Sequence, residues 1–245
     1  MKLFWIFLLV PFFALSQTAI VTAEGFLKEK QYDKAVTLLD NHIKNNSSDL
    51  KAIELLGDAY GHQKKWDEAI VTYKKLVDLS PKTANYHYKY GGALGMKALS
   101  VSKFKAVGYV GDAKQAFLKA AELDTKHIDT RWALVELYIQ LPGIIGGSKS
   151  KALKYANELE ALSKVDGYLA KGYIYEYDKE PELAETYYKK AVTTGGSITC
   201  YTKLTQFYIN QKQPKKALVY LHEGYKIHKT DEFLKQIKTL ESQLK

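Results

Sequence analysis

Cysteine is nearly absent from this chain: Cys200 is the only one in 245 residues, so no intramolecular disulfide can form. Arginine is equally scarce, because Arg131 is the sole arginine among 36 basic residues. Lysine carries the rest of a formal net charge of +9 and is spread along the sequence, often in pairs. Reading of base edges and bidentate contact with phosphates usually call on arginine. The basic charge therefore indicates a solvated outer face rather than nucleic-acid recognition.

Recognisable catalytic and metal-binding motifs are also missing. The six histidines show no His-Glu-x-x-His spacing, and no Cys-x-x-Cys or Gly-x-Ser-x-Gly pattern occurs. Glu158 and Glu160 lie two residues apart and face different directions on a helix, so they do not form an acid–base pair. The sequence therefore predicts a protein that is not an enzyme and that uses no metal and no cofactor.

The first sixteen residues form a segment of their own. Lys2 precedes an unbroken apolar run over residues 3–15, and Ala14 and Ser16 are the small residues of a cleavage site. As a helix the run would span about 20 Å, short of the roughly 30 Å hydrocarbon core of a bilayer. We therefore predict a cleaved signal peptide over residues 1–16, with an uncleaved anchor as the alternative. An exported chain without disulfides points to the periplasm or outer envelope of a Gram-negative bacterium.

Six alanines mark an internal repeat. Each sits in a near-copy of one local pattern, in which Tyr, Phe, Leu or Ala follows after three intervening residues. The gaps between successive alanines are 34, 44, 39, 32 and 33 residues. The alanines are Ala35, Ala69, Ala113, Ala152, Ala184 and Ala217. A period near 34 that survives insertions is the signature of a repeat array.

The clearest copy runs over residues 50–81. It contains a Leu-Gly pair at 56–57, then Ala69 and Tyr73, and it ends at Pro81. This copy resembles the tetratricopeptide repeat (TPR), a unit of two antiparallel helices. Gly57 and Ala69 lack bulk where the two helices would cross, so the backbones can approach closely and Tyr73 can fill the space beside them. Pro81 cannot continue the second helix.

The resemblance extends in register over residues 18–230. It implies an all-α fold, a right-handed superhelical TPR solenoid of five to six antiparallel helix pairs over residues 17–230. Residues 231–245 are predicted to form a capping helix that closes the last repeat, because apolar residues recur there at helical spacing. These residues are Leu234, Ile237, Leu240 and Leu244.

Two insertions interrupt the period. The first, near residues 97–111, predicts a lengthened first helix followed by a loop. Exposed Leu99, Phe104 and Tyr109 would form a patch for a partner. The alternative is that these side chains pack back on the neighbouring repeat.

The second insertion, near residues 142–148, is rich in glycine and precedes Lys149. It falls one glycine short of a P-loop and follows a predicted helix where a P-loop needs a strand, so we expect no nucleotide binding. Two interpretations stay open. The backbone amides of Gly146, Gly147 and Ser148 would hold an anion at the start of the next helix. Otherwise Ser148 or Ser150 would cap that helix behind a tight turn.

In TPR proteins the first helix of each pair lines a concave groove where ligands usually bind. The resemblance implies a set of twelve groove residues that is acidic and aromatic, although the chain as a whole is basic. They are Glu54, Asp58, His62, Tyr88, Trp132, Glu136, Gln140, Tyr173, Glu176, Tyr177, Gln206 and Asn210. The carboxylates would attract a lysine or arginine of a partner, and the aromatic faces would stack on it. The alternative is a set of ordinary solvated residues.

These features predict a non-enzymatic scaffold or adaptor. Its groove would bind a peptide or protein segment, basic or aromatic in character, of another cell-envelope protein. The alternative function is a periplasmic carrier of a small ligand or cargo, with both insertions roofing a pocket. A closed cavity of a few hundred Å³ beneath the insertions would favour the carrier, and an open trough would favour the adaptor.

Overall fold

The computed structural model describes residues 10–244, and side chains from residue 18 onward. Residues 1–9, which are most of the predicted signal peptide, and residue 245 lie outside the described part. Within it the chain forms thirteen α-helices and no strand. The prediction of an all-α fold is confirmed. The handedness of a superhelix stays a prediction.

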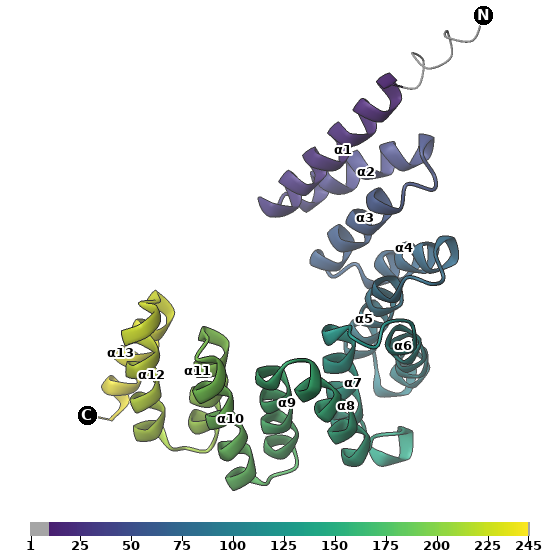
Figure 1. The fold of residues 1–245 in the computed structure, drawn as a ribbon. Coiled ribbons are helices and arrows are strands. Elements are labelled where there is room, and N and C mark those ends of the chain that lie inside the picture. The colour runs from purple at the N-terminus through teal and green to yellow at the C-terminus, as the bar shows by residue number, and fades with distance from the viewer. Residues whose placement is uncertain (1–9, 245) are drawn as a thin grey trace, which may run out of the picture. The chain divides into compact units, whose positions relative to one another are not determined.

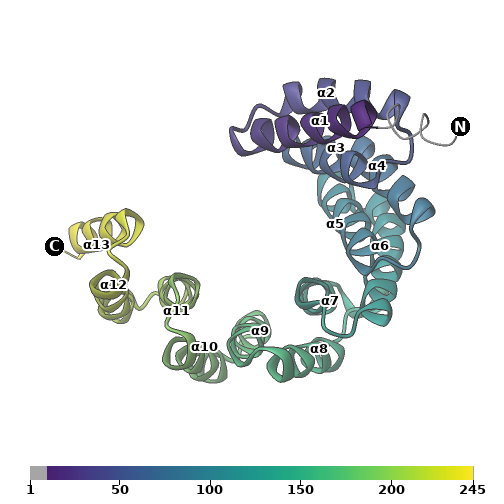
Figure 2. The same cartoon turned by 45° about the horizontal axis from the view of Figure 1, so that its top comes forward.

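The chain divides into two compact units, one up to His127 and one from Ile128 onward (Figures 1 and 2). The first unit contains α1 (Val10–Lys28), α2 (Tyr32–Asn45), α3 (Leu50–His62), α4 (Trp66–Leu79), α5 (Ala84–Ser100) and α6 (Lys103–Leu123). The second contains α7 (Ile128–Gln140), the 3-10 turn η1 (Gly143–Ile145), α8 (Lys149–Leu162), α9 (Lys164–Tyr177), α10 (Pro181–Gly195), α11 (Ile198–Asn210), α12 (Pro214–His228) and α13 (Asp231–Gln243).

The helices pair in sequence order, and α13 packs on α12 at the end of the second unit. We call the odd-numbered helices α1 to α11 the A helices and their partners α2 to α12 the B helices. Each of the six repeated alanines lies on a B helix and is at most 1 % exposed. The alanine period therefore marks the B helices, because only a small side chain fits where a B helix contacts its A helix.

Each of three glycines on A helices lies under an aromatic ring of its B helix. A Cβ added to Gly57 would be 2.4 Å from the ring of Tyr73, and one added to Gly172 would be 2.6 Å from Tyr188. At Gly91 the ring is that of Phe117, at 2.9 Å. Carbon atoms do not approach so closely without displacement, so these positions require glycine. A small A residue thus matches a large B residue.

The turn from A helix to B helix has one conformation in four repeats. A lysine adopts a left-handed backbone with φ between 56° and 61°. In two examples, the next backbone N–H donates to a carbonyl near the end of the A helix, Lys65 to Tyr60 at 2.9 Å and Glu180 to Tyr175 at 2.8 Å. This is the Schellman arrangement that ends many helices. The four lysines are Lys30, Lys64, Lys179 and Lys212.

The first insertion does not form the expected loop. α5 and α6 have 17 and 21 residues, against 13 to 15 in the helices from α2 to α4 and from α7 to α13. Only Val101 and Ser102 separate them. The lengthened first helix is therefore correct and the loop is wrong. Gly108 and Gly111 each lower helix propensity by about 1 kcal/mol relative to alanine, but the extended pairing of α5 with α6 outweighs that preference.

A matched pair of substitutions tests the glycine–aromatic fit. Gly57→Ala should lower the free energy of unfolding by about 1–3 kcal/mol, because the methyl group would overlap the Tyr73 ring. Gly92→Ala in α5 is the control, since a Cβ there meets nothing within 4 Å. It should be neutral or stabilise by roughly 0.5–1 kcal/mol. Urea unfolding followed by circular dichroism measures both, and equal midpoints would contradict the role of Gly57.

Candidate functional site

In the second unit, predicted groove residues from three successive A helices form one connected row. Gln140 on α7 donates from Nε2 to the Tyr173 hydroxyl on α9 at 2.7 Å, and the Tyr177 hydroxyl donates to the Gln140 carbonyl at 3.3 Å. Asn210 on α11 donates from Nδ2 to Glu176 at 3.0 Å and accepts from Gln206 at 2.9 Å. We call these residues, with Glu136 on α7, the α7–α9–α11 row.

Glu176 is fixed from two sides. One carboxylate oxygen accepts from Asn210, and the other accepts from the Tyr188 hydroxyl at 2.8 Å. Tyr188 is the B-helix ring that packs on Gly172, and burial together with the Glu176 charge raises its pKa. The hydroxyl therefore stays protonated and donates. The core aromatic thus holds an acidic side chain of the row in place.

Glu136 is exposed and accepts none of the hydrogen bonds given for the row. Partial desolvation of its carboxyl raises the pKa, and the charge of Lys203 on α11 only partly opposes this. Among residues 18–244 no lysine or arginine forms an ion pair with Glu136 or Glu176. Neither carboxylate is therefore in an ion pair, although the Lys203 charge acts on Glu136. Tyr177, which follows Glu176, is 49 % exposed.

Trp132 lies on α7 but is not part of this row. Its indole N–H donates to Asp166 at the start of α9 at 3.0 Å, and its ring packs against the core of the second unit. We infer a positioning role for Trp132 between neighbouring A helices.

In the first unit the two predicted acidic residues already share one lysine of the chain. Lys89 on α5 contacts Asp58 at 2.6 Å and Glu54 at 3.1 Å, both on α3. Asp58 also accepts from the Tyr73 hydroxyl at 2.6 Å. Burial alone would lower the pKa of Lys89, but Asp58 and Glu54 outweigh it and hold the pKa above its usual value. These carboxylates therefore bind a lysine of the chain itself.

The two remaining predictions in the first unit lie apart from this ion pair. His62 stacks on Tyr32 of α2, with ring centroids 4.9 Å apart. The Tyr88 ring lies 6.1 Å from Phe117 of α6 and 5.2 Å from His127. The structure thus joins Glu54 with Asp58, but not with His62 or Tyr88.

Lys89 was not among the predicted residues, although the sequence contains a signal for it. Hydrogen bonds between successive A helices join residues about one repeat apart: 31 for Lys89 and Asp58, 33 for Gln140 and Tyr173, and 34 for Asn210 and Glu176. A search for complementary side chains at that separation would have found the pair.

The second insertion offers no anion site. The amide of Gly146 donates to the Gly143 carbonyl, that of Gly147 to Pro142, and that of Ser148 to Tyr138, at 2.8–3.1 Å. All three amides that were considered for an anion are therefore used within the chain. Ser148 instead accepts from the Lys151 amide at 3.3 Å and caps α8. The capping interpretation is the one that the geometry supports.

Lys149, the next residue, is equally engaged. Its ammonium forms ion pairs with Asp178 and Glu180 and lies 5.2 Å from the Tyr175 ring centroid. Hydrogen bonds to the two carboxylates raise the pKa of Lys149 to about 12. The cation that completes the near-match to a P-loop thus joins α8 to the end of α9.

The first insertion was expected either to expose Leu99, Phe104 and Tyr109 as a patch or to pack them on the neighbouring repeat, and the three residues differ. Phe104 is 92 % exposed and Leu99 is 76 % exposed. Tyr109 is half-buried. The exposed pair fits the patch, whereas Tyr109 is partly packed.

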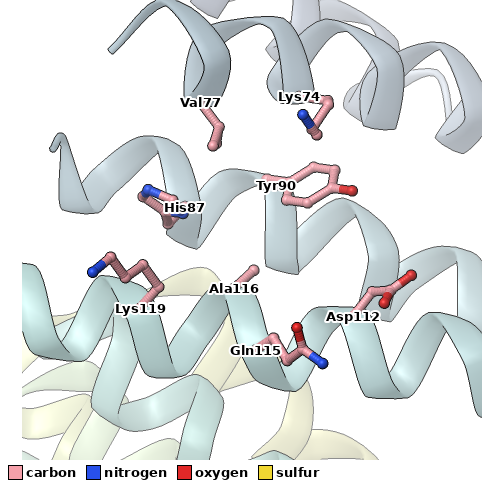
Figure 3. A pocket seen from close by; sticks show the side chains of 8 residues that line it. All are labelled: Lys74, Val77, His87, Tyr90, Asp112, Gln115, Ala116 and Lys119. Carbon is pink, nitrogen blue, oxygen red and sulfur yellow. The ribbon is translucent and has the colours of Figure 1, made fainter. Parts of the chain in front are cut away.

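A cleft of the first unit has a volume of about 370 Å³ and lies over α4, α5 and α6 (Figure 3). Its lining residues are Lys74, Val77, His87, Tyr90, Asp112, Gln115, Ala116 and Lys119. A neighbouring cleft of about 430 Å³ shares Lys74 and Tyr90 with it. Both are open to solvent, and no residue of either insertion lines them.

Among the residues that the structure describes, no group of three or more His, Cys, Asp and Glu side chains is arranged to hold a metal. Within residues 10–244, the helices are too short or too polar to cross a bilayer. Arg131, the sole arginine, is 3 % exposed and contacts Glu158 at 3.3 Å.

Stacked helix pairs with a period near 34 residues define a helical-repeat protein. Family models described as "TPR repeat" and "Tetratricopeptide repeat" match residues 57–97 and 165–194. A third, described as "Anaphase-promoting complex, cyclosome, subunit 3", matches residues 2–76. The chain is a tetratricopeptide-repeat protein.

Curated relatives match only in part. The Tetratricopeptide repeat protein 30 homolog of Drosophila pseudoobscura pseudoobscura is 24 % identical over 94 residues, which are 38 % of this chain. The homolog of Drosophila melanogaster is 25 % identical over 91 residues, or 37 % of this chain. In each case the match spans 14 % of the relative's length.

Solved structures share the fold over most of the chain. A tetratricopeptide repeat protein of Parabacteroides merdae has a TM-score of 0.62 at 12 % identity, covering 86 % of this chain and 79 % of that one. PilW, a type IV pilus biogenesis factor, has a TM-score of 0.62 at 15 % identity, and the match covers 92 % of this chain and 98 % of PilW. YrrB, described as having an unusual peptide-binding site, has a TM-score of 0.52 at 17 % identity, and the match covers 74 % of this chain and 87 % of YrrB. At such identities the likeness shows the fold alone.

The electrostatics of the row predict a pH-dependent effect of Glu136→Gln. A carboxyl whose pKa is higher in the folded state disfavours folding above both pKa values and has no effect when both states are protonated. The substitution should therefore raise the urea midpoint at pH 7, and the gain should vanish near about pH 3.

Glu182→Gln, at an exposed position in the first turn of α10, is the control; because the helix dipole favours a negative charge there, it should leave the midpoint unchanged or slightly lower at pH 7, the opposite direction to Glu136→Gln. An equal gain from Glu136→Gln at both pH values would show that its charge is not the cause.

Proposed function

We propose that this protein is a non-enzymatic scaffold whose α7–α9–α11 row binds a peptide segment that carries lysine or arginine beside an aromatic residue. The observation that carries the proposal is that Glu136 and Glu176, whose charges both act on Tyr173, form no ion pair with a described residue, and that Tyr177, which follows Glu176, is exposed. A cationic side chain would gain attraction from both carboxylates and could stack on a tyrosine face.

The row is held in place before any partner arrives. Tyr173 and Tyr177 bond to Gln140, and Glu176 bonds to Asn210 and Tyr188. Groups that are ordered in the free protein lose little conformational entropy on binding. Preorganisation supports a binding surface rather than an incidental set of solvated residues.

The proposal is confined to the second unit. In the first unit Lys89 occupies the position that a cationic partner would take beside Glu54 and Asp58. The fold of YrrB, whose description names a peptide-binding site, supports peptide binding by analogy only.

The clefts favour this adaptor over a small-ligand carrier. They have volumes of about 370, 430 and 380 Å³ and are open to solvent. None is lined by Phe104 or by the Gly143–Ser150 segment, which would have roofed a carrier's pocket.

Peptide binding in solution tests the proposal. Short peptides containing Lys, Arg and Tyr should bind the full chain more tightly than the same peptides with Glu in place of the basic residues. Exposed cation–π contacts and ion pairs each contribute about 0.5–1 kcal/mol. Glu136→Gln with Tyr177→Ala should therefore weaken binding by roughly 5- to 30-fold, measured by fluorescence anisotropy.

The matched control combines Glu182→Gln on α10 with Val219→Ala on α12. Both residues are exposed and lie on B helices, and the charge change is the same. Glu176 is left unchanged because its loss would leave the buried Tyr188 hydroxyl without an acceptor. Equal weakening by control and test variants, or equal binding of the Glu peptides, would contradict the proposal.

We also propose that the partner lies in the cell envelope of a Gram-negative bacterium, because residues 1–16 have the pattern of a signal peptide. Expression of the full chain in such a host should yield a periplasmic product that begins at Gln17. Intact mass and N-terminal sequencing measure this. A cytoplasmic product that retains residues 1–16 would refute export, and a membrane-bound product that retains them would favour the uncleaved anchor.

A further inference from the structure

The end of the α5/α6 hairpin gathers exposed apolar side chains. Met96 and Leu99 lie near the end of α5 and are 44 % and 76 % exposed. Phe104 and Val107 lie in the first turns of α6 and are 92 % and 51 % exposed. Spacing of three residues puts each pair on one face of its helix. Because only two residues join the helices, the four side chains share one end of the hairpin. We call them the hairpin tip.

The sequence of the hairpin tip carries charge of one sign, although Asp67 and Glu68 of α4 act on Lys97 at its edge. No aspartate or glutamate occurs between Asp78 and Asp112, whereas the same stretch contains five lysines. Lys89 and Lys97 are paired with carboxylates of α3 and α4. Lys103 and Lys105 have no ion pair with any residue that the structure describes. The hairpin tip therefore carries two uncompensated cations beside its apolar side chains.

We infer that the hairpin tip docks on a lipid surface that contains anionic phospholipids. Leu99, Phe104 and Val107 would enter the boundary between headgroups and acyl chains. The Lys103 and Lys105 ammonium groups would contact lipid phosphates. Apolar side chains flanked by lysines are the composition that binds at such an interface.

The shape of this surface favours lipid over a protein partner. Neither of the two clefts described above for the first unit is lined by a residue of the hairpin tip. A projecting apolar end needs a complementary hollow in a folded partner, whereas a fluid bilayer yields to it. Lysine stems can also lie along the apolar side chains while their charges stay in water.

Co-sedimentation of the full chain with vesicles tests the assignment. Vesicles of phosphatidylethanolamine with phosphatidylglycerol should bind it several-fold better than phosphatidylcholine vesicles. Leu99→Ser with Phe104→Ser should lower the partition coefficient roughly tenfold. Lys103→Gln with Lys105→Gln should lower it on the anionic vesicles alone. The control, Val71→Ser with Lys82→Gln, changes exposed residues of the same unit outside the hairpin tip and should have no effect.

A local probe separates the hairpin tip from the apolar run at residues 3–15, which can itself bind vesicles. Cys200 is fully buried, so a thiol-reactive bimane on Phe104→Cys labels one position. Its emission should shift to the blue on anionic vesicles, while a label on Val71→Cys should not shift. Unshifted emission at position 104 on bound chain, or equal partition of the hairpin-tip and control variants, would overturn the inference and leave a protein partner for this surface.

Discussion

The fit between a small A-helix residue and a large B-helix residue governs both units. Where the A helix has Gly57, Gly91 or Gly172, the B helix supplies a ring that occupies the missing side chain's space. At the equivalent register of α7 and α8 the sizes are exchanged, with Val135 on the A helix and Ala156 on the B helix, both fully buried. In these four repeats the combined size of the two side chains is preserved, rather than the identity of either residue.

This packing also determines which carboxylates of the A helices accept a tyrosine hydroxyl. The hydroxyls of Tyr73 and Tyr188 reach the A helix and bond to Asp58 and Glu176. In α7 and α8 the exchange of sizes leaves Ala156 where those tyrosines stand, so no hydroxyl from that position can reach Glu136. The carboxyl is then partly desolvated without a donor, which is why its pKa rises. The candidate site thus follows from one exception in the core.

Much of the fold could be predicted from the sequence because the repeat is local. The alanine period locates every B helix, and the pairing of Gly57 with Tyr73 follows from helical spacing within one unit. The site was predictable only in part, since ligand positions say which residues line the A helices but not what opposes them. Lys89 of the following repeat forms ion pairs with Glu54 and Asp58, and the separation of 31 residues between Lys89 and Asp58 exceeds any single-repeat pattern.

The insertions were the least predictable because they replace the turn that the other repeats share. Four turns close with a left-handed lysine and a Schellman pair, and α5/α6 and α7/α8 are the two hairpins without it. A glycine-rich segment can satisfy its own amides, as residues 143–148 do, or be drawn into a longer helix pair, as residues 103–111 are. Composition does not distinguish these outcomes, because the neighbouring helix determines whether packing exceeds the local cost of glycine. At residues 143–148 the backbone amides are therefore occupied within the chain, whereas the longer helix pair exposes apolar side chains to solvent.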